Sequence, residues 1–458
     1  MRVKLYLFDT SKRRLEENLK AVGFDLERLV AEFGPQDYQL PPGPSNNPWQ
    51  ARDPYGERLS QPGQPGLGYG IPLEAENEKV AREFLGRFRE RAFGSDRPDI
   101  ARILGIDLTP LSMTSAKPNQ HWCAGDGMGR HFAGRAQANR LIELESLQAC
   151  KLTGAGVNVF VVDQGINRHY LETLGGTYGG GMYWTADGKS QVPGEMQPPH
   201  APAPKGHGAM LLRSLVDIAP DATYFDLPLL PQRITEVENF SLRALFAFAF
   251  LNYFFLSCNG PWVILNAWGI VDRFSEKLRG FYTDDPNHAL NSYLSELGCH
   301  HDVIFAAGNS GQFCGDPRSS GYDCGPGRSI WGANGLPDVT CVGAVRGDGI
   351  WVGAASQGPG PGGFDTGAGR PEKPDVCAPS WFVENANAHL RSAGTSGASA
   401  VVAGAVAALR QGWSMNAVSP AEMRKALRDG SHGSAGKGWN ARYGDGILNL
   451  AGTIAQLP

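Results

Sequence analysis

Four polar residues stand at positions where the chain could do chemistry. Asp163 ends an apolar run, His207 lies between two glycines, Asn309 follows another apolar run, and Ser396 begins a long stretch of small residues. A serine nucleophile needs a base to take its proton, and a histidine base needs a carboxylate to fix its tautomer. The oxyanion that then forms needs preorganised donors, which an asparagine amide and a helix N-terminus supply. The four residues together therefore match the needs of acyl transfer.

Taken singly, each of these residues has an ordinary structural explanation. An aspartate after a strand and an asparagine after a glycine are common turn residues. A serine at a helix start is a common cap, and an isolated histidine there is most often a polar surface residue. It is the combination, in the order aspartate, histidine, asparagine and serine, that favours catalysis.

The stretch SAGTSGASAVVAGAVAALRQ, residues 392–411, predicts the helix that carries Ser396. Its residues are small and mostly apolar on every side, which is typical of a fully buried helix. Gly394 allows the chain to turn just before the helix begins. Ser396 is then expected in the first turn, where unpaired N–H groups favour negative charge.

From about residue 136, short apolar runs alternate with helical stretches. Such runs, apolar on both faces, predict an α/β fold: a doubly wound, mainly parallel sheet with helices on both faces. Ligands bind beyond the carboxyl ends of these strands, where Asp163 and Asn309 are expected. A dinucleotide-binding turn is excluded, because Gly154 and Gly156 precede their strand instead of following it. The predicted strands are residues 157–163, 222–230, 262–268, 302–308 and 338–345.

These motifs resemble those of the subtilisin-like serine peptidases, the subtilases, over roughly residues 136–455. VVDQGI, GHGA, AAGNSG and GTSGASAVVAG resemble the family's aspartate, histidine, asparagine and serine motifs. VILNAWG, KPDVCAPS and YGDGILNL resemble the substrate-lining strand, the segment before the nucleophile and the closing segment. Several departures indicate a divergent branch, although none removes a proton-transferring group or an oxyanion donor: Gln164, Ala209, Ala267, Gly397, Ala400 and Val401.

The resemblance implies a serine endopeptidase that cleaves protein or peptide substrates through an acyl-enzyme. It implies that Ser396 attacks the scissile carbonyl while His207, oriented by Asp163, accepts the proton. Asn309 and the Ser396 N–H are expected to hold the oxyanion. An extended substrate is expected to lie against five positions: Ala267, Trp268, Gly269, Ala307 and Gly308.

Two other classes compete with this interpretation. A catalytically silent scaffold could keep the same fold for binding, although the complete set of catalytic residues argues against it. A lipase-like hydrolase is disfavoured, because GTSGA lacks the second glycine of a nucleophile elbow and the order of the triad differs.

Composition sets further bounds on the protein. The chain has 458 residues, a formal net charge of −4, 60 glycines, 32 prolines and 8 cysteines. This weak charge argues against nucleic acid or an anionic membrane as a partner. We expect no cofactor and no metal, because no cluster of histidine, cysteine and carboxylate has ligand spacing. The apolar run 244–256 predicts a core helix, being too short for a membrane span, and the N-terminus has no secretory pattern, so we expect a cytoplasmic protein.

Residues 1–135 are expected to form an accessory, prodomain-like region, and residues 136–458 the peptidase domain. A strand at 2–8, two short helical patterns and a charged helix at 73–93 are predicted, with a Pro- and Gly-rich linker at 40–72. This strand content is lower than a simple prodomain requires. We hypothesise that the region restrains the active site or couples it to a regulatory protein partner.

Two features leave alternatives open. The stretch between Asp163 and His207 is rich in glycine and proline, which predicts equally a flexible gate beside the site and a disordered surface loop. Cys314 and Cys324 flank a glycine-rich loop and are compatible with a disulfide or with two free thiols.

Overall fold

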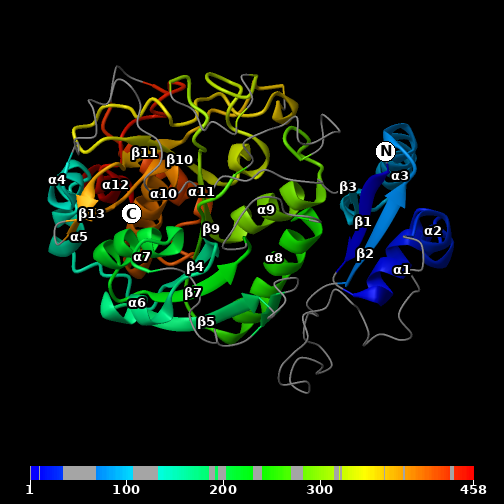
Figure 1. Ribbon diagram of the computed structural model, residues 1–458, viewed down its shortest axis with the longest axis horizontal. Coiled ribbons are helices and arrows are strands. Elements are labelled where there is room, and N and C mark those ends of the chain that lie inside the picture. Colours follow the sequence, from blue (N-terminus) through cyan, green and yellow to red (C-terminus); the bar gives the residue numbers. More distant parts are fainter. Residues whose placement is uncertain are drawn as a thin grey trace.

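The fold is taken from a computed structural model of the chain. The structure describes residues 2–9, 11–34, 69–106, 133–184, 191–193, 203–230, 240–269, 282–313, 319, 322–365, 367–384, 387–433 and 438–458. These residues form two units, a small N-terminal one and a large α/β unit that holds the predicted site (Figure 1).

The large unit is built on one sheet with the strand order β11-β10-β9-β8-β4-β7-β5-β6. Within the described residues its first seven strands run parallel, and β6 pairs antiparallel with β5 at the edge. The predicted α/β fold with a mainly parallel sheet is therefore confirmed. The strands are β4 (Asn158–Asp163), β5 (Thr177–Trp184), β6 (Gln191–Pro193), β7 (Thr223–Pro228), β8 (Trp262–Asn266), β9 (Asp302–Ala306), β10 (Thr340–Val345) and β11 (Val376–Pro379).

Helices cover both faces of this sheet, because successive residues of each buried strand point to opposite sides. Val159 and Val161 of β4 pack in the same core as α7 (His207–Ile218) and α10 (Gly394–Gly412). Phe160 and Val162 pack in a second core with α8 (Phe240–Ser257) and α9 (Ala289–His300). Further α-helices among the described residues of the unit are α4 (Arg135–Leu141), α5 (Glu145–Ala149), α6 (Arg168–Thr173), α11 (Pro420–Asp429) and α12 (Leu450–Gln456).

Helix α10 runs through the interior of the molecule. Every residue from Gly394 to Arg410 is buried, and the helix packs on α7 and on four strands of the sheet. Small side chains allow this close approach: a Cβ on Gly404 would lie only 3.1 Å from the Cβ of Ile218 in α7. The predicted buried helix is confirmed, and the reason for its composition is the crowding around it.

Helix α8 is the apolar segment that the sequence placed in a core. By length and composition it could also cross a membrane, but 71% of the stretch is buried inside the molecule. Phe240 and Phe248 are fully buried against the sheet and α9. The helix therefore has the surroundings of a core helix.

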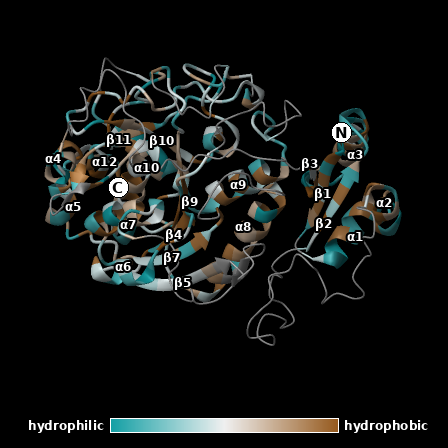
Figure 2. Ribbon diagram, in the orientation of Figure 1, coloured by the Kyte–Doolittle hydropathy of each residue, from teal (hydrophilic) through white to brown (hydrophobic). Residues whose placement is uncertain are grey.

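The N-terminal unit contains a three-stranded antiparallel sheet in the order β2-β1-β3. Its elements are β1 (Val3–Asp9), α1 (Lys12–Ala21), α2 (Leu26–Phe33), β2 (Tyr69–Ala75), α3 (Glu78–Phe93), the 3₁₀ helix η1 (Pro98–Ile103) and β3 (Leu104–Ile106). The unit has a hydrophobic core of its own, and its helices carry both hydrophilic and hydrophobic residues (Figure 2). The prediction of a low strand content for this region was wrong, because the sequences of β2 and β3 carry only weak local strand signals.

Two element assignments need correction for the same reason. Residues 69–75, divided by the sequence patterns between a linker and a helix, form strand β2 through pairing with β1. Residues 177–184, expected in a flexible gate or a disordered loop, form strand β5, which pairs with β7. Distant pairing partners, which local patterns do not reveal, decide both cases. Residues 35–68, most of the expected linker, and 194–202, the proline-rich part of the insertion, lie outside the described residues.

The N-terminal unit docks on the α8 and α9 side of the large unit (Figure 1). Tyr6 and Phe8 of β1 belong to the same hydrophobic core as α8. Two ion pairs border this contact: Arg89 with Asp285 at 2.7 Å and Arg102 with Glu296 at 2.6 Å.

Candidate active site

Asp163 and His207 meet at the carboxyl edge of the sheet. Asp163 is the last residue of β4 and His207 the first residue of α7, and both are buried. The His207 Nδ1 lies 2.8 Å from each carboxylate oxygen of Asp163. Gly208 makes the approach possible, because a Cβ there would lie 2.1 Å from the Gly165 carbonyl oxygen. An Nδ1–H held by a carboxylate leaves the other ring nitrogen as the basic one.

That other nitrogen has no partner within the described part of the chain. His207 Nε2 is buried there and makes no hydrogen bond to any described residue. A buried polar atom without a partner is costly in free energy and usually marks strain or function. His207 therefore has the arrangement of a general base waiting for a donor.

Ser396 lies in the first turn of α10, after Gly394 with a φ of +67°. Its Oγ donates a hydrogen bond to the Ala267 carbonyl at 3.3 Å, not to His207. The starts of the two helices are nevertheless joined, since the Ala393 N–H donates to the Met210 Sδ at 3.2 Å. Each of those residues is three positions from its catalytic candidate, so the structure brings Ser396 and His207 to the same edge of the fold.

Asn309 follows β9 and is held by the residue next to Ser396. Its Oδ1 accepts from the Thr395 N–H at 3.0 Å and from the Thr395 hydroxyl at 3.2 Å. With the oxygen occupied, the Nδ2 remains as the donor for a ligand. Gly394 is required here, because a Cβ would lie 3.1 and 3.2 Å from the two ends of this amide.

The expected substrate-lining residues form two neighbouring backbone segments. Asn334 holds them together by donating from Nδ2 to the Trp268 carbonyl at 3.0 Å and to the Ala306 carbonyl at 2.7 Å. The Trp268 indole is buried in the core between Phe240 and Phe305, so only its backbone can face a substrate.

The other expected lining positions are also mainly backbone. Ala267 offers its carbonyl to Ser396, and Gly269 lies against Asn334, where a Cβ would be 3.1 Å from the amide. The Ala307 N–H donates to the Val342 carbonyl, and the Gly308 N–H donates to Thr395 Oγ1 at 3.1 Å.

Sequence reasoning missed Asp226, a buried carboxyl beside Asp163. Asp226 lies in β7, and its Oδ2 accepts the Ile166 N–H at 3.1 Å, which fixes the turn after Asp163. Burial raises the pKa of Asp226 well above its usual range, and the nearby Asp163 adds to the increase against the lowering effect of the Ile166 bond. An acidic residue inside the apolar run ATYFDLPLL is the signal that could have found it.

Thr395 and Asn334 were also missed. Thr395 adjoins the nucleophile candidate in sequence, so its position was available as a signal. Asn334 lies in a 3₁₀ turn, Gly332–Gly335, with no pattern in the sequence that points to the site.

Among the described residues, no group of three or more His, Cys, Asp or Glu is placed to hold a metal ion. Cys314 lies outside the described residues, and with it the question of whether it pairs with Cys324.

Comparison with known families finds one match, over part of the chain. The model of the subtilase family, Peptidase S8, matches residues 252–446, a segment that contains Asn309 and Ser396. A comparison with curated proteins finds no match. The expected resemblance to the subtilisin-like serine peptidases is confirmed over this segment, and the match supports a serine endopeptidase hydrolase.

Solved structures with a similar arrangement are subtilisin-like or described as proteases. MycP1 from Mycobacterium smegmatis is 17% identical, with 76% of this chain and 88% of that chain covered and a TM-score of 0.44. Fervidolysin from Fervidobacterium pennivorans, a keratinolytic enzyme, is 15% identical, with 99% and 61% covered and a TM-score of 0.48. A lanthipeptide protease is 17% identical, with 73% and 97% covered and a TM-score of 0.47.

Proposed function

We propose that the protein is a serine endopeptidase in which Ser396 is the nucleophile, His207 the general base and Asp163 its orienting carboxylate. The observation that carries the proposal is the state of His207: Nδ1 bound to Asp163, and Nε2 buried without a partner among the described residues. A histidine in this state is ready to accept a hydroxyl proton.

The reaction begins when Ser396 Oγ leaves the Ala267 carbonyl and turns toward His207 Nε2. Oγ attacks the carbonyl carbon of the peptide bond as His207 takes its proton, and the carbonyl oxygen becomes the oxyanion. His207 then gives the proton to the leaving amine, and the acyl group stays on Ser396. Water, deprotonated by His207, releases the acyl group as an acid and restores the serine.

The oxyanion is stabilised by two donors that are in place before substrate arrives. Asn309 Nδ2 is one, since Thr395 occupies the other end of the amide. The Ser396 N–H at the start of α10 is the second, because the first N–H groups of a helix have no partner within it. By kinship with the subtilases, each preorganised donor of this kind is expected to contribute a factor of about 10²–10³ to turnover.

The substrate is proposed to lie extended along the backbone of residues 267–269 and 307–308. Backbone lines these segments, and a peptide that adds as a strand would use main-chain groups there other than the Ala307 and Gly308 N–H groups and the Trp268 carbonyl, which are bound within the fold. This favours protein and peptide substrates over small molecules.

The first prediction tests the nucleophile. A fluorophosphonate probe should label wild-type protein at Ser396, and Ser396→Ala should lose labelling and reduce cleavage of an unfolded protein substrate by about 10³-fold or more. Mass spectrometry locates the label, and peptide release measures cleavage.

Ser399→Ala is the matched control, because Ser399 is equally buried in α10 and its Oγ only donates to the Ser396 carbonyl at 2.9 Å. If wild-type protein neither reacts with the probe nor cleaves, and still binds peptides, the silent-scaffold alternative replaces this proposal.

We also propose that the N-terminal unit restrains the enzyme or presents it to a regulatory protein partner. The support is its position: β1 packs on α8, and the first residue of α8, Phe240, packs on the Trp268 indole beside Ala267. The contact thus reaches the strand end that holds Ser396. A change in docking can shift that strand end and with it the position of the nucleophile.

A further inference from the structure

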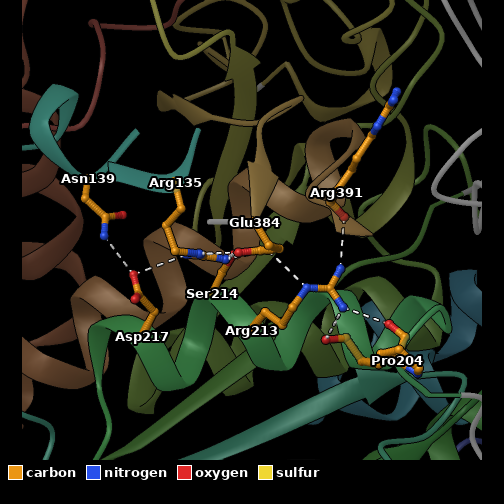
Figure 3. Close-up of polar contacts among 9 residues, drawn as sticks. Arg135, Asn139, Pro204, Arg213, Ser214, Asp217, Glu384 and Arg391 are labelled. Carbon is orange, nitrogen blue, oxygen red and sulfur yellow. Dashed lines mark hydrogen bonds and ion pairs between the residues drawn. The ribbon is translucent and has the colours of Figure 1, made fainter. Parts of the chain in front are cut away.

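A cluster of charged side chains joins α4, α7 and strand β12 (Val383–Glu384) beside the site (Figure 3). Arg135 donates to both oxygens of Glu384, at 2.5 Å from Nε and 2.8 Å from Nη2. Arg213 donates to the same carboxylate from Nε at 3.0 Å. Asp217 completes the cluster by accepting from Arg135 at 3.2 Å and from Asn139 at 2.9 Å.

Three of these charges are removed from water, while the Asp217 side chain is 32% exposed. Arg135 is 6% exposed, Arg213 7% and Glu384 8%. Burial opposes the charge on Arg135, but the carboxylates of Glu384 and Asp217 outweigh it, so its pKa is raised. Such a cluster adds little net stability over well-packed apolar residues, whereas losing one member leaves an unpaired buried charge. The main effect of the cluster is therefore the geometry that it imposes on the segments it joins.

Arg213 connects the approaches to both helices of the site. It lies in α7, and its Nη1 donates to the Pro204 carbonyl at 2.8 Å, three residues before His207. Its Nη2 donates to the Arg391 carbonyl at 3.0 Å, five residues before Ser396. One rigid, planar guanidinium thus binds a carbonyl of the segment that enters α7 and a carbonyl of the segment that enters α10.

Glu384 fixes Arg213 from a third element. It ends strand β12 (Val383–Glu384), which pairs with β13 (Asn387–Arg391), and β13 leads directly into the turn before Ser396. Arg135 of α4 clamps the carboxylate from the other side, so Glu384 has little freedom to move. The Arg213 guanidinium is therefore held by contacts to three separate segments: the Pro204 carbonyl, the Arg391 carbonyl and the Glu384 carboxylate.

We propose that Arg213 and Glu384 are positioning residues that set the separation of His207 and Ser396. The inference rests on the proposed function, since it concerns the alignment of its base and nucleophile. Neither residue touches substrate. They act by holding the Pro204 and Arg391 carbonyls, so that the two helix starts keep the spacing that proton transfer needs. A displacement of about 1 Å at reacting atoms can cost a factor of about 10² in rate.

The buried Arg410–Asp302 pair serves as a matched control for Arg213, because it lies far from the site and is expected to have a structural role alone. Arg410 is also fully buried in a paired state, and it donates to Asp302 from Nε at 2.5 Å and from Nη2 at 2.8 Å. It lies near the C-terminal end of α10, sixteen positions after Gly394 at the other end. Lysine at either position keeps the charge but cannot form the fork.

The experiment compares Arg213→Lys with Arg410→Lys in the full chain. We expect both to lower the midpoint of thermal unfolding. Only Arg213→Lys should lower kcat, by about 10- to 100-fold, with KM changed less than about threefold. The rate at which a small fluorophosphonate labels Ser396 should fall in parallel with kcat, because that reagent bypasses the peptide-binding segments. If Arg213→Lys does not fold, Glu384→Asp, which shortens the carboxylate arm, should show the same loss of kcat.

The outcomes separate the two proposals. Wild-type cleavage with equal losses of kcat in the two lysine variants, or with none in either, overturns the positioning role and leaves the catalytic assignment intact. Absence of any Ser396-dependent activity in the wild-type protein overturns both. A selective loss of kcat and labelling in Arg213→Lys, at a stability matched by Arg410→Lys, supports the positioning role.

Discussion

Asn309 keeps the Nδ2 end of its amide available to a ligand, because Thr395 occupies the oxygen end with two donors. His207 is arranged on the same principle, with Asp163 on Nδ1 and no partner on Nε2 among the described residues. At the scale of single residues, the site is thus defined by which atoms are already bound and which are left available. A buried polar atom that is left available can bind a reacting group without the free-energy cost of removing water from it first.

His288 shows how a buried side chain outside the site controls stability. Its Nδ1 accepts the Leu290 N–H at 3.2 Å at the start of α9, and its Nε2 lies 3.2 Å from the Ile106 carbonyl. Burial is the largest cause that lowers the pKa of His288 to about 4, with Arg89 adding to it against the Ile106 carbonyl and Asp285. The folded protein therefore keeps this ring neutral.

From this we predict a stability that depends on pH. In the unfolded chain His288 binds a proton below its ordinary pKa of about 6.5, whereas in the folded chain it binds one only below about pH 4. The free energy of unfolding should therefore fall as pH falls from 6.5 to 4, by about 3 kcal/mol from this residue. Urea unfolding at pH 7.5, 5.5 and 4.5 measures it. His288→Asn should flatten the slope, while His169→Asn, an exposed histidine, should not; equal slopes in all three proteins would contradict the assignment.

At the scale of elements, α10 is adapted to its surroundings more than to helix propensity. Gly397 stands where the subtilases usually have methionine, and the structure supplies the reason. A Cβ there would lie 2.2 Å from the Ser392 Oγ and 3.0 Å from the Ser380 Oγ. The segment before the helix folds back over its first turn, which leaves no room for a side chain.

Gly397→Ala should therefore destabilise the protein although alanine is the better helix former. Overpacking of this kind costs about 1–3 kcal/mol. Thermal unfolding measures the loss, and the reactivity of Ser396 with a fluorophosphonate should fall with it.

Two further variants test the mechanism of this loss. Gly86→Ala in α3, where a Cβ meets nothing within 4 Å, should stabilise by about 0.5–1 kcal/mol. The double variant Gly397→Ala with Ser392→Ala should recover most of the loss, because the Ser392 Oγ is the clashing atom and has no hydrogen-bond partner among the described residues. No recovery would show that the contact with Ser392 is not the cause.

At the scale of the whole molecule, the N-terminal unit is joined to the enzyme through the α8 and α9 side. The Arg89–Asp285 pair is largely shielded from solvent, with side chains 19% and 13% exposed. A partly buried pair of this kind contributes more than one on the open surface. It is therefore a suitable place to test whether docking restrains catalysis.

Arg89→Glu should weaken docking by placing two negative charges together, and under the proposed restraint should raise the rate of peptide cleavage by about fivefold or more. Adding Asp285→Lys restores opposite charges and should return the rate toward that of the wild type. Arg87→Glu makes the same charge change at an exposed position of α3 and should leave the rate unaltered. Equal rates in all four proteins would remove the restraint proposal and leave the catalytic one standing.

Much of this organisation was readable from local patterns. The apolar runs before Asp163 and Asn309 predicted parallel strands, and the small residues around Ser396 predicted a buried helix; the fold confirms these elements. Strand β5 and the N-terminal strands β2 and β3 were not readable, because their stability comes from pairing with residues far along the chain.

The sequence by itself determined the strands and the helix that carry Asp163, Asn309 and Ser396, and that these polar residues stand at their ends, because periodicity and residue size act over a few positions. Only the tertiary structure decided which of those ends meet and what holds them. Arg135, Arg213 and Glu384 lie up to 249 positions apart, and no local pattern marks them as partners. Burial makes them partners, because a charge taken out of water must find its opposite wherever the fold brings one.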